Sequence, residues 1–442
     1  MEKERGPLPE SLKPGNADVQ QKLDLKSGLR PPGGAENASG KQAESDKVLL
    51  AKLREFYRQL HSPFIAKEEE ARVFTLALMC IEHEGTFGKH GTSKSALARR
   101  ALSLIEAKKF ETQLSENSTK EEIVGVYNPD KLRNEGILEY NTEGMLPEAE
   151  VAFIDEAYMG TAGLRVAFHS IKNERRFHNG GKIMKCPLMT VFETSEFVPY
   201  GEEDQATYDR DLFRYFTNPT PSDRTSDLMH SGRDIEYKGL VEASATVIST
   251  SDIRAIYKRL YDIDTSVVEP ELISLINEVS DKIKGMYISD RRKSKVLKTI
   301  AANAFLEGRK TAAIEDLIVL KYVLPRDEDE AKQVAAILEN LISPANHISR
   351  LDAATFSINA AIAALDKSPE MQIDYADATA AVSNARKYAK MLLKEYADKS
   401  LRKSARALLK SARIYAEKIS RFALEAGQDE NAAQDTFPET DQ

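Results

Sequence analysis

The chain has 442 residues, of which 41% are apolar, and it carries a net charge of −8 with a pI near 5.6. That length exceeds one simple domain and predicts two or three, and the acidic balance argues against nucleic-acid binding by the protein as a whole while leaving room for a local basic face. The two cysteines, Cys80 and Cys186, stand at no metal-ligand spacing, which argues against a disulfide framework and favours a reducing compartment.

The amino-terminal segment, residues 1–46, mixes Pro, Gly, Ser and Gln with charges of both signs and has too few apolar residues to bury a face, so we expect a disordered tail. It lacks the apolar core of a signal peptide, and no apolar run in the chain approaches the roughly 18 residues of a membrane helix. We therefore expect a cytoplasmic protein. From Lys47 apolar residues recur at helical spacing with one break at Pro63, which predicts two helices.

The rest of the chain divides into segments with different residue patterns. Short β-rich runs alternate with helical ones up to about Thr217, which predicts an α/β domain with a covered parallel sheet over 47–220. Strand signals then fade, and helical runs predict an all-α lid over 221–325. Helical patterning continues over 326–426, with the acidic "RDEDE" as a helix start or connector. Residues 427–442 carry five acids and no base, which is typical of a disordered tail.

The stretch "GKHGTSKS" has the outline of a phosphate-binding loop, although Ser93 stands where the strict pattern has its second glycine. It lies between a predicted strand end and a strong helix former. In such a loop, backbone N–H groups hold the phosphates, Lys94 adds a positive charge, and Ser95 offers its hydroxyl to Mg²⁺. We expect Ser93 to fit the loop only with a negative φ. The candidate nucleotide contacts are Gly88, Gly91, Thr92, Ser93, Lys94 and Ser95.

For this stretch taken alone, a Gly/Ser-rich turn that opens a helix is the simpler interpretation. The apolar run "VAFIDEA" changes the balance because it ends in Asp155 and Glu156. Carboxylates at the carboxyl end of a buried strand face the edge where phosphates bind. Asp155 would hold Mg²⁺ and Glu156 would orient and polarise the attacking water. Two ordinary acids at a strand end remain the alternative, but together the two motifs predict nucleotide binding.

Five stretches, in family order, resemble the MoxR branch of the AAA+ ATPases and, within it, the RavA-like proteins. The resemblance covers about Phe64 to Leu324. "GKHGTSKSALARR" is similar to a MoxR phosphate loop in which a small residue replaces the second glycine. The others are the helix-2 insert running into "VAFIDEA", the hairpin "IKNERRFHNGG" with an Asn179-Gly180 turn, the arginine-finger segment "ATYDRDLFRYF", and the sensor-2 helix "SDRRKSKVLKTIAANAFLEGR".

The resemblance implies roles for matching residues. Arg210 is the favoured arginine finger, with Arg214 the runner-up, and Arg291 is the favoured sensor-2 arginine, with Arg292 next to it. A surface ion pair with Asp209 and a solvated helix face remain the alternatives. At the sensor-1 asparagine of the family this chain has Ser195, whose shorter reach implies slow hydrolysis as an alternative. The histidines form no metal-ligand pattern, so we expect no metal beyond Mg²⁺.

The fold class implied is an AAA+ P-loop α/β domain with a parallel sheet, followed by an all-α lid and a C-terminal helical region. The resemblance further implies an ATPase that assembles as a ring, with a hexamer expected, in which Arg210 serves the neighbouring site. ATP turnover would remodel an unidentified client in a chaperone-like manner, with a von Willebrand factor A-domain partner. A nucleotide-gated scaffold with little turnover, or a DNA-associated AAA+ machine, are the alternatives.

One basic stretch stands out in this acidic chain. Residues 386–421 hold twelve Lys or Arg against three acids, and their apolar residues recur at helical intervals: Tyr388, Leu392, Tyr396, Leu408, Ala412, Tyr415 and Ile419. The simpler interpretation is a helix that packs its apolar stripe and leaves a solvated basic face. The sharper hypothesis is a docking surface for an acidic partner or for the acidic tail.

Overall fold

A computed structural model of the chain describes residues 35–161, 164, 168, 170–199, 201, 205, 207–238, 245–367, 375–395 and 399–425. The chain divides into two units after Val48, and the second comprises residues 49–442. Helix α2 spans Ala35–His61, so residues 35–46 are helical and not part of a disordered tail as we had expected. Residues 1–34 and 427–442, the rest of the two expected tails, lie outside the described residues.

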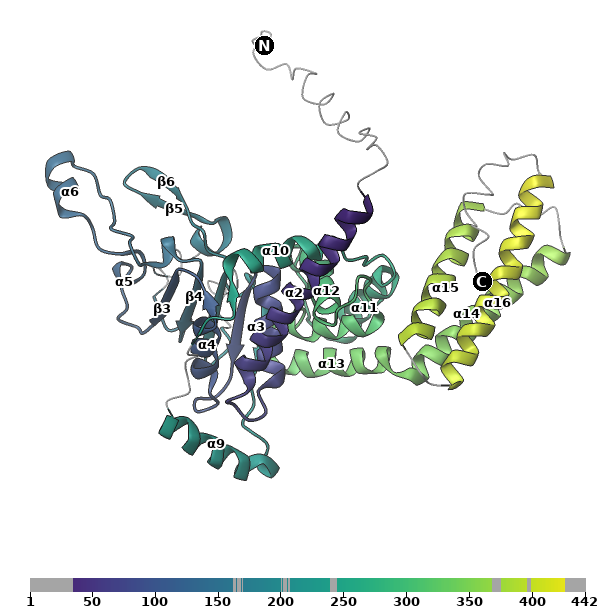
Figure 1. Cartoon of the computed structure of the whole chain (residues 1–442), viewed down its shortest axis with the longest axis horizontal. Coiled ribbons are helices and arrows are strands. Elements are labelled where there is room, and N and C mark those ends of the chain that lie inside the picture. Colours follow the sequence, from purple (N-terminus) through teal and green to yellow (C-terminus); the bar gives the residue numbers. More distant parts are fainter. Residues whose placement is uncertain are drawn as a thin grey trace, which may run out of the picture. The chain divides into compact units, whose positions relative to one another are not determined.

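A five-stranded parallel sheet forms the centre of the second unit (Figure 1). Its strands, in the spatial order β3-β4-β7-β1-β8, are β3 (Lys109–Gln113), β4 (Val151–Asp155), β7 (Thr190–Ser195), β1 (His83–Phe87) and β8 (Asp211–Phe216). Every neighbouring pair is parallel. The carboxyl ends of all five strands therefore meet at one edge, where ligands of open α/β sheets bind.

Alternation along the strands supplies a hydrophobic core on each face of the sheet. On β4, Phe153 belongs to the larger core cluster with the helices α3 (Glu68–Cys80) and α4 (Lys94–Ser103), whereas its neighbours Ala152 and Ile154 belong to a second cluster. Successive strand residues point to opposite faces, so a covered sheet needs apolar residues at both parities. Cys80 and Cys186 are both buried free thiols, in keeping with the expected absence of a disulfide between them.

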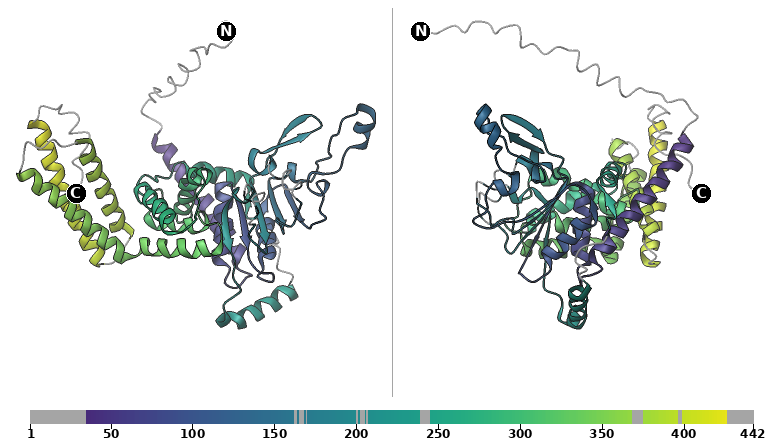
Figure 2. Two further views of the ribbon diagram at one scale, coloured as in Figure 1. Left: turned by 180° about the vertical axis from the view of Figure 1, so that it is seen from behind. Right: turned by 60° about the vertical axis from the view of Figure 1, so that its left-hand side comes forward.

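An insert and a hairpin project together from this domain (Figures 1 and 2). The insert comprises α5 (Glu121–Val124), α6 (Pro129–Glu135) and the 3-10 turn η3 (Leu146–Glu148); the hairpin comprises β5 (Arg176–Asn179) and β6 (Lys182–Lys185), preceded by the π-helix η4 (Ser170–Glu174). The two loop residues are Gly180 and Gly181, both with positive φ, and not Asn179-Gly180 as expected. The Asn179 side chain instead accepts from the Tyr140 N–H at 2.6 Å and donates to the Tyr140 carbonyl at 3.0 Å.

The segment after β8 is mainly helical, as expected. It contains η5 (Ser222–Arg224), α9 (Thr225–Lys238), α10 (Thr250–Leu260), α11 (Glu269–Lys282), α12 (Asp290–Leu306) and the 3-10 helix η6 (Ile314–Tyr322). A short strand, β9 (Ile248–Ser249), leads into α10 and pairs with β2 (Ile105–Glu106), which tethers the start of the lid to the α/β domain.

Four helices follow: α13 (Glu328–Ile342), α14 (Pro344–Lys367), α15 (Tyr375–Glu395) and α16 (Lys399–Glu425). The acidic stretch after Pro325 does begin a helix, because the Asp327 side chain caps α13 by accepting from the Glu330 N–H at 2.8 Å. Helices α14–α16 share a core of their own. No helix of the described residues is both long and apolar enough to cross a membrane.

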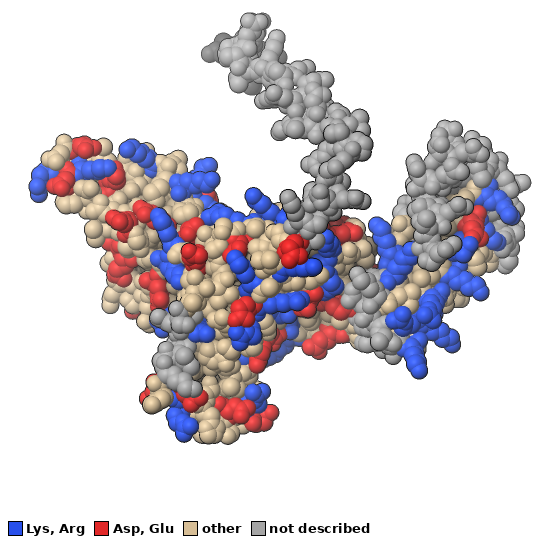
Figure 3. Space-filling model, in the orientation of Figure 1, with Lys and Arg blue, Asp and Glu red and all other residues tan. Residues whose placement is uncertain are grey.

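The basic stretch 386–421 falls on two helices, α15 and α16, and not on one. Of its apolar residues, Leu392, Leu408, Ala412 and Ile419 are buried in the core of the bundle; Tyr396 lies outside the described residues. Lys and Arg side chains gather over this bundle in Figure 3. The exposed cations of α16 that recur at helical spacing are Lys403, Arg406, Lys410 and Arg413. The apolar stripe thus packs as the simpler interpretation predicts.

Candidate active site

The predicted phosphate loop joins β1 to α4 at the carboxyl edge of the sheet. At Gly88 (φ +148°) the backbone N–H donates to the Ser195 carbonyl at 3.1 Å, and a Cβ would lie 2.5 Å from the Thr217 carbonyl oxygen, so only glycine fits. Ser93 has φ +63°, and our expectation of a negative φ is wrong. The serine takes the left-handed conformation that a glycine would take, because the chain must turn there to enter α4.

Lys94 is the first residue of α4, and its side chain folds back under the loop. Its ammonium donates to the carbonyl oxygens of Gly88 at 2.6 Å and Lys89 at 2.8 Å. Burial lowers the pKa of Lys94, against the attraction of Glu156, Glu196 and other carboxylates nearby. The cation is therefore held beneath the backbone amides that would receive phosphate oxygens.

Ser95 and Asp155 meet as expected of a Mg²⁺ site. The Ser95 hydroxyl lies 3.0 Å from Asp155 Oδ1, which is about the separation of two adjacent ligands around an octahedral ion with bonds of 2.0–2.1 Å. Thr194 on β7 donates its hydroxyl to the same Oδ1 at 2.5 Å and fixes the carboxylate. The residues present therefore fit a Mg²⁺ ion that completes its shell with water and phosphate oxygens.

Glu156 follows Asp155 directly and leaves the strand with φ +51°. Burial raises the pKa of Glu156, and the charges of Asp155 and Glu196 add to the shift. A raised pKa makes the carboxylate a better proton acceptor once it is ionised. The geometry thus separates the two acids, with Asp155 turned to Ser95 and Glu156 half-buried beside it.

The side chain of Ser195 does not face the loop. Its hydroxyl donates to the Phe197 carbonyl at 2.9 Å and accepts from the Phe197 N–H at 3.3 Å, and the residue is fully buried. The next residue, Glu196, is the one that reaches the loop, with Oε1 3.2 Å from Nδ1 of His90. The family resemblance placed the sensor at Ser195, but the turn after the strand presents the side chain of Glu196 to the loop.

Arg210 and Arg291 lie at the end of the sheet opposite the loop. Asp211, which opens β8, is in register with His83, which opens β1, whereas the loop follows the last residue of β1. Five residues at 3.3 Å each separate the two ends by roughly 16 Å, which is beyond the reach of an arginine side chain. The structure therefore does not bring Arg291 to the phosphate loop of its own protomer.

Arg291 lies away from the loop because of the way in which α12 docks. Its first turn packs on the segment before β8, where Nη1 of Arg291 lies 3.4 Å from Asp209 Oδ2. Arg210 is half-buried beside it: burial lowers the pKa of Arg210, and the charge of Arg291 lowers it further. Two guanidinium groups of one protomer thus lie together, away from that protomer's phosphate loop.

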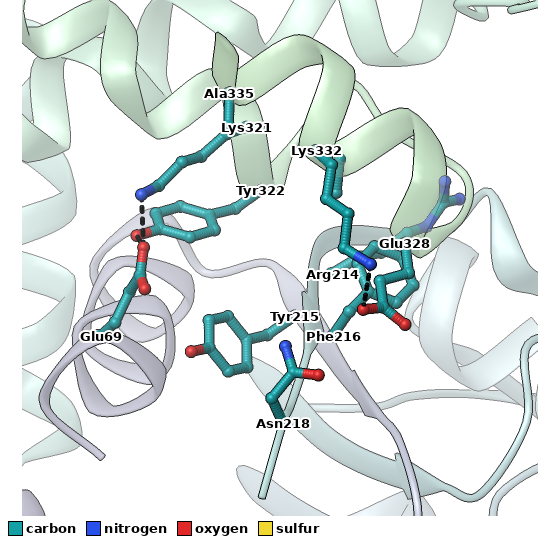
Figure 4. A pocket seen from close by; sticks show the side chains of 11 residues that line it. Glu69, Arg214, Tyr215, Phe216, Asn218, Lys321, Tyr322, Glu328, Lys332 and Ala335 are labelled. Carbon is teal, nitrogen blue, oxygen red and sulfur yellow. Dashed lines mark hydrogen bonds and ion pairs between the residues drawn. The ribbon is translucent and has the colours of Figure 1, made fainter. Parts of the chain in front are cut away.

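The two runner-up arginines are structural. Arg292 is buried, donating to the carbonyl of Asp211 at 2.6 Å and to Asp209 Oδ1 at 3.1 Å. Arg214 is buried as well, donating to the Pro325 carbonyl at 3.0 Å and stacking on the ring of Tyr208. Figure 4 shows Arg214 at the wall of a pocket of about 220 Å³ between β8, η6 and α13. Neither guanidinium is available to a neighbouring subunit.

Sequence reasoning missed three residues around the acids: Thr194, Glu196 and Arg99. Arg99 Nη2 lies 3.8 Å from Asp155 Oδ2, and its Nε donates to Glu111 at 2.6 Å. Arg99 comes four residues after Ser95, so both lie on one face of α4, and this spacing could have identified Arg99 from the sequence. Thr194 and Glu196 flank Ser195, and both face the site, Thr194 toward Asp155 and Glu196 toward the loop.

Comparison with known proteins gives matches along the same segments. Residues 51–258 match the model of a MoxR domain found in MoxR-vWA-beta-propeller ternary systems, and residues 268–338 match an AAA lid domain. Two uncharacterized proteins of Methanocaldococcus jannaschii, MJ0079 and MJ0812, are each 32% identical over about two thirds of this chain and 74% of their own length. Structural protein ORF618 of Acidianus two-tailed virus is 24% identical over 66% of this chain and 53% of its own.

Among solved structures, that of a candidate ATPase from Cytophaga hutchinsonii matches with a TM-score of 0.55 at 16% identity, covering 70% of this chain and 98% of that one. At this identity the likeness concerns the fold.

Proposed function

The chain belongs to the MoxR family of AAA+ ATPases, and from that premise we propose that it hydrolyses ATP to remodel or activate a partner protein. The observation that carries the proposal is the loop of Gly88 to Ser93 with Lys94 beneath it and the Ser95–Asp155 pair beside it, all at the carboxyl edge of one sheet. Phosphate, metal and water-activating groups are thereby within reach of one triphosphate.

In this proposal each group has one task. The loop amides and Lys94 bind the β- and γ-phosphates. Mg²⁺, held by Ser95 and Asp155, would neutralise charge on the phosphates. Glu156 accepts the proton of the attacking water, for which it must be ionised. Thr194 and Arg99 hold the Asp155 carboxylate in place.

The two remote arginines support an assembly in which each site is shared. Because Arg210 and Arg291 cannot reach the loop of their own protomer, we propose that both reach the site of the neighbour in a closed ring, as a hexamer or another ring size. A guanidinium supplied in trans stabilises the charge of the transferring phosphoryl group. The partial burial of Arg210 orients its side chain before the neighbour docks.

A partner with a von Willebrand factor A domain is supported by the MoxR-vWA systems for which the matching domain is named. Copurification of such a protein with the tagged chain, strengthened by ATP, is the expected result. A client captured without it would contradict this part of the proposal.

The function is tested by separating binding from hydrolysis. Lys94→Ala should abolish ATP binding, because the loop loses its cation, whereas Glu156→Gln should bind ATP and retain it unhydrolysed. Filter binding of labelled ATP and phosphate release measure the two steps. Hydrolysis at the parent rate by Glu156→Gln would show that Glu156 is not the base.

A slow enzyme, used as a nucleotide-gated scaffold, is the second candidate. It is favoured by the site at the end of β7, where the hydroxyl of Ser195 is bonded to Phe197 and the carboxylate of Glu196 lies near the loop. A turnover number near zero in the assembled, partner-bound protein, with tight ATP binding, would favour it.

A further inference from the structure

Lys172 is a fully buried lysine that the proposed reaction does not use. It lies in the π-helix η4, and its Nζ donates to Glu193 Oε1 at 2.5 Å and to Asp211 Oδ1 at 2.8 Å. Asp211 Oδ2 accepts from the Tyr158 hydroxyl at 2.7 Å. Such a cluster is costly to bury and tolerable only when each charge is paired.

The cluster joins the three segments that carry the proposed catalytic groups. Tyr158 comes two residues after Glu156, Glu193 comes three residues before Glu196 on β7, and Asp211 directly follows Arg210. Lys172 thus contacts both β7 and β8, and through Asp211 it is linked to Tyr158.

Burial, and then the charge of Asp211, raise the pKa of Glu193, which favours its protonated form. Burial alone would raise the pKa of Asp211, but the Lys172 ammonium outweighs it and the pKa of Asp211 is lowered. Lys172 and Asp211 therefore form a neutral ion pair, with Glu193 bonded to both.

Asp211 is held from two sides. Its carboxylate is bound by Lys172 and Tyr158, while its carbonyl accepts from Arg292 of α12. The backbone immediately after Arg210 is therefore fixed, although the Arg210 side chain itself is only half-buried. The position from which Arg210 leaves the sheet depends on these anchors.

We propose that Lys172 is a positioning residue, which fixes Asp211 and thereby sets where Arg210 is presented to the neighbouring subunit. The inference rests on the proposed trans role of Arg210. Through Tyr158 and Asp211, the same contacts connect the segment that carries Glu156 to Arg210, which would act in the neighbouring subunit. Lys172 itself touches neither nucleotide nor metal.

The first test compares Lys172→Met with Lys185→Met, an exposed lysine on β6. Lys172→Met should keep ATP affinity within a few-fold and lower kcat on the order of 10²-fold, because misplacing a catalytic group by about 1 Å has that effect. Lys185→Met should match the parent. Equal loss of ATP affinity and kcat in Lys172→Met would overturn the proposal.

A second variant guards against misfolding. Lys172→Met with Asp211→Asn removes the ion pair without leaving a buried charge and should fold. It should still turn over slowly, because the anchor is lost. Full recovery of kcat in this double variant would show that charge balance, and not positioning, is what Lys172 provides.

Mixed assemblies assign the defect to a subunit. Lys172→Met mixed with Lys94→Ala should regain activity, because the first supplies an intact loop and the second an intact Arg210 presentation. Lys172→Met mixed with Arg210→Ala should not regain activity. If Arg210→Ala is rescued by Lys94→Ala and Lys172→Met is not, the Lys172 proposal is wrong.

If Arg210→Ala is not rescued either, the trans role of Arg210 fails, and hydrogen exchange decides about Lys172 separately. Amides of residues 208–211 should exchange at least tenfold faster in Lys172→Met than in Lys185→Met. Unchanged exchange there would overturn the positioning role whatever the activity shows.

Discussion

At Ser93 the backbone angle matters more than the side chain. The residue is left-handed, and its hydroxyl makes no capping hydrogen bond to α4. Ser93→Gly should therefore raise the free energy of unfolding by about 0.5–1 kcal/mol, because glycine relieves the left-handed strain. Urea unfolding measures it, with Ser93→Ala as the control that keeps the strain. No gain over Ser93→Ala would show that the loop is not strained there.

The charge of Glu196 should shift the acid limb of the pH–rate profile through its effect on Glu156. The pKa of Glu156 is raised by burial, by Asp155 and by Glu196, and the base must be ionised, so kcat should fall as pH drops through this raised pKa. Glu196→Gln removes one of the three causes and keeps its backbone N–H. The acid limb should then move to lower pH, by less than about one unit.

The control is Glu135→Gln, an exposed carboxylate on α6, whose profile should coincide with that of the parent. A limb that stays in place in Glu196→Gln would mean that its charge is not felt by the base.

In helix α16 the residues that pack in the bundle core are distinct from the residues that carry its positive charge. Its apolar residues are in the bundle core, and its cations recur on one exposed face. Replacing Lys403, Arg406, Lys410 and Arg413 by Gln should leave the bundle's unfolding midpoint and the ATPase rate unchanged. It should slow association with poly-glutamate, an acidic polypeptide probe, at low salt, because surface charges set encounter rates.

A matched variant removes four exposed lysines elsewhere: Lys182, Lys185, Lys258 and Lys282. It should bind the probe like the parent. An unchanged on-rate in the α16 variant would reduce this face to a solvated surface, and a selective loss of duplex DNA binding with a smaller salt slope would favour the DNA-associated alternative.

The sequence predicts those helices and strands best whose formation depends on a local residue pattern. The loop, β4 with its acids and the hairpin strands follow from local patterns. Strand β1 was recognised only in part, because His83 and Glu84 at its start are polar; both are buried, and His83 accepts from the Val191 N–H at 3.0 Å. The choice between Ser195 and Glu196 depended on the turn after β7, and local sequence does not fix it.

For the molecule as a whole, the order of the strands and the docking of the lid could not be derived from periodicity. The family resemblance implies a nucleotide contact for Arg291, yet α12 packs on the amino end of β8 and places this arginine at the far end of the sheet. Tertiary contacts of Arg292, which is buried against the carbonyls of Asp211 and Leu212, decide that placement.

The sharing of each site between two subunits should therefore be detectable in the ATPase turnover of variants and of their mixtures. Arg210→Ala should retain ATP affinity within a few-fold and lose turnover on the order of 10³-fold, the lower end for a missing arginine finger. Mixing it with Lys94→Ala should restore activity, because one subunit contributes the loop and the other the arginine. Absence of recovery in rings shown to be mixed would place Arg210 in a structural role.

Because the loop and the arginines lie at opposite ends of one sheet, a protomer on its own would carry both halves of a site and be unable to join them. In the shared-site arrangement, diluting the protein silences it while ATP still binds. Specific activity then rises with protein concentration, and cells could set the output of the enzyme by its abundance alone.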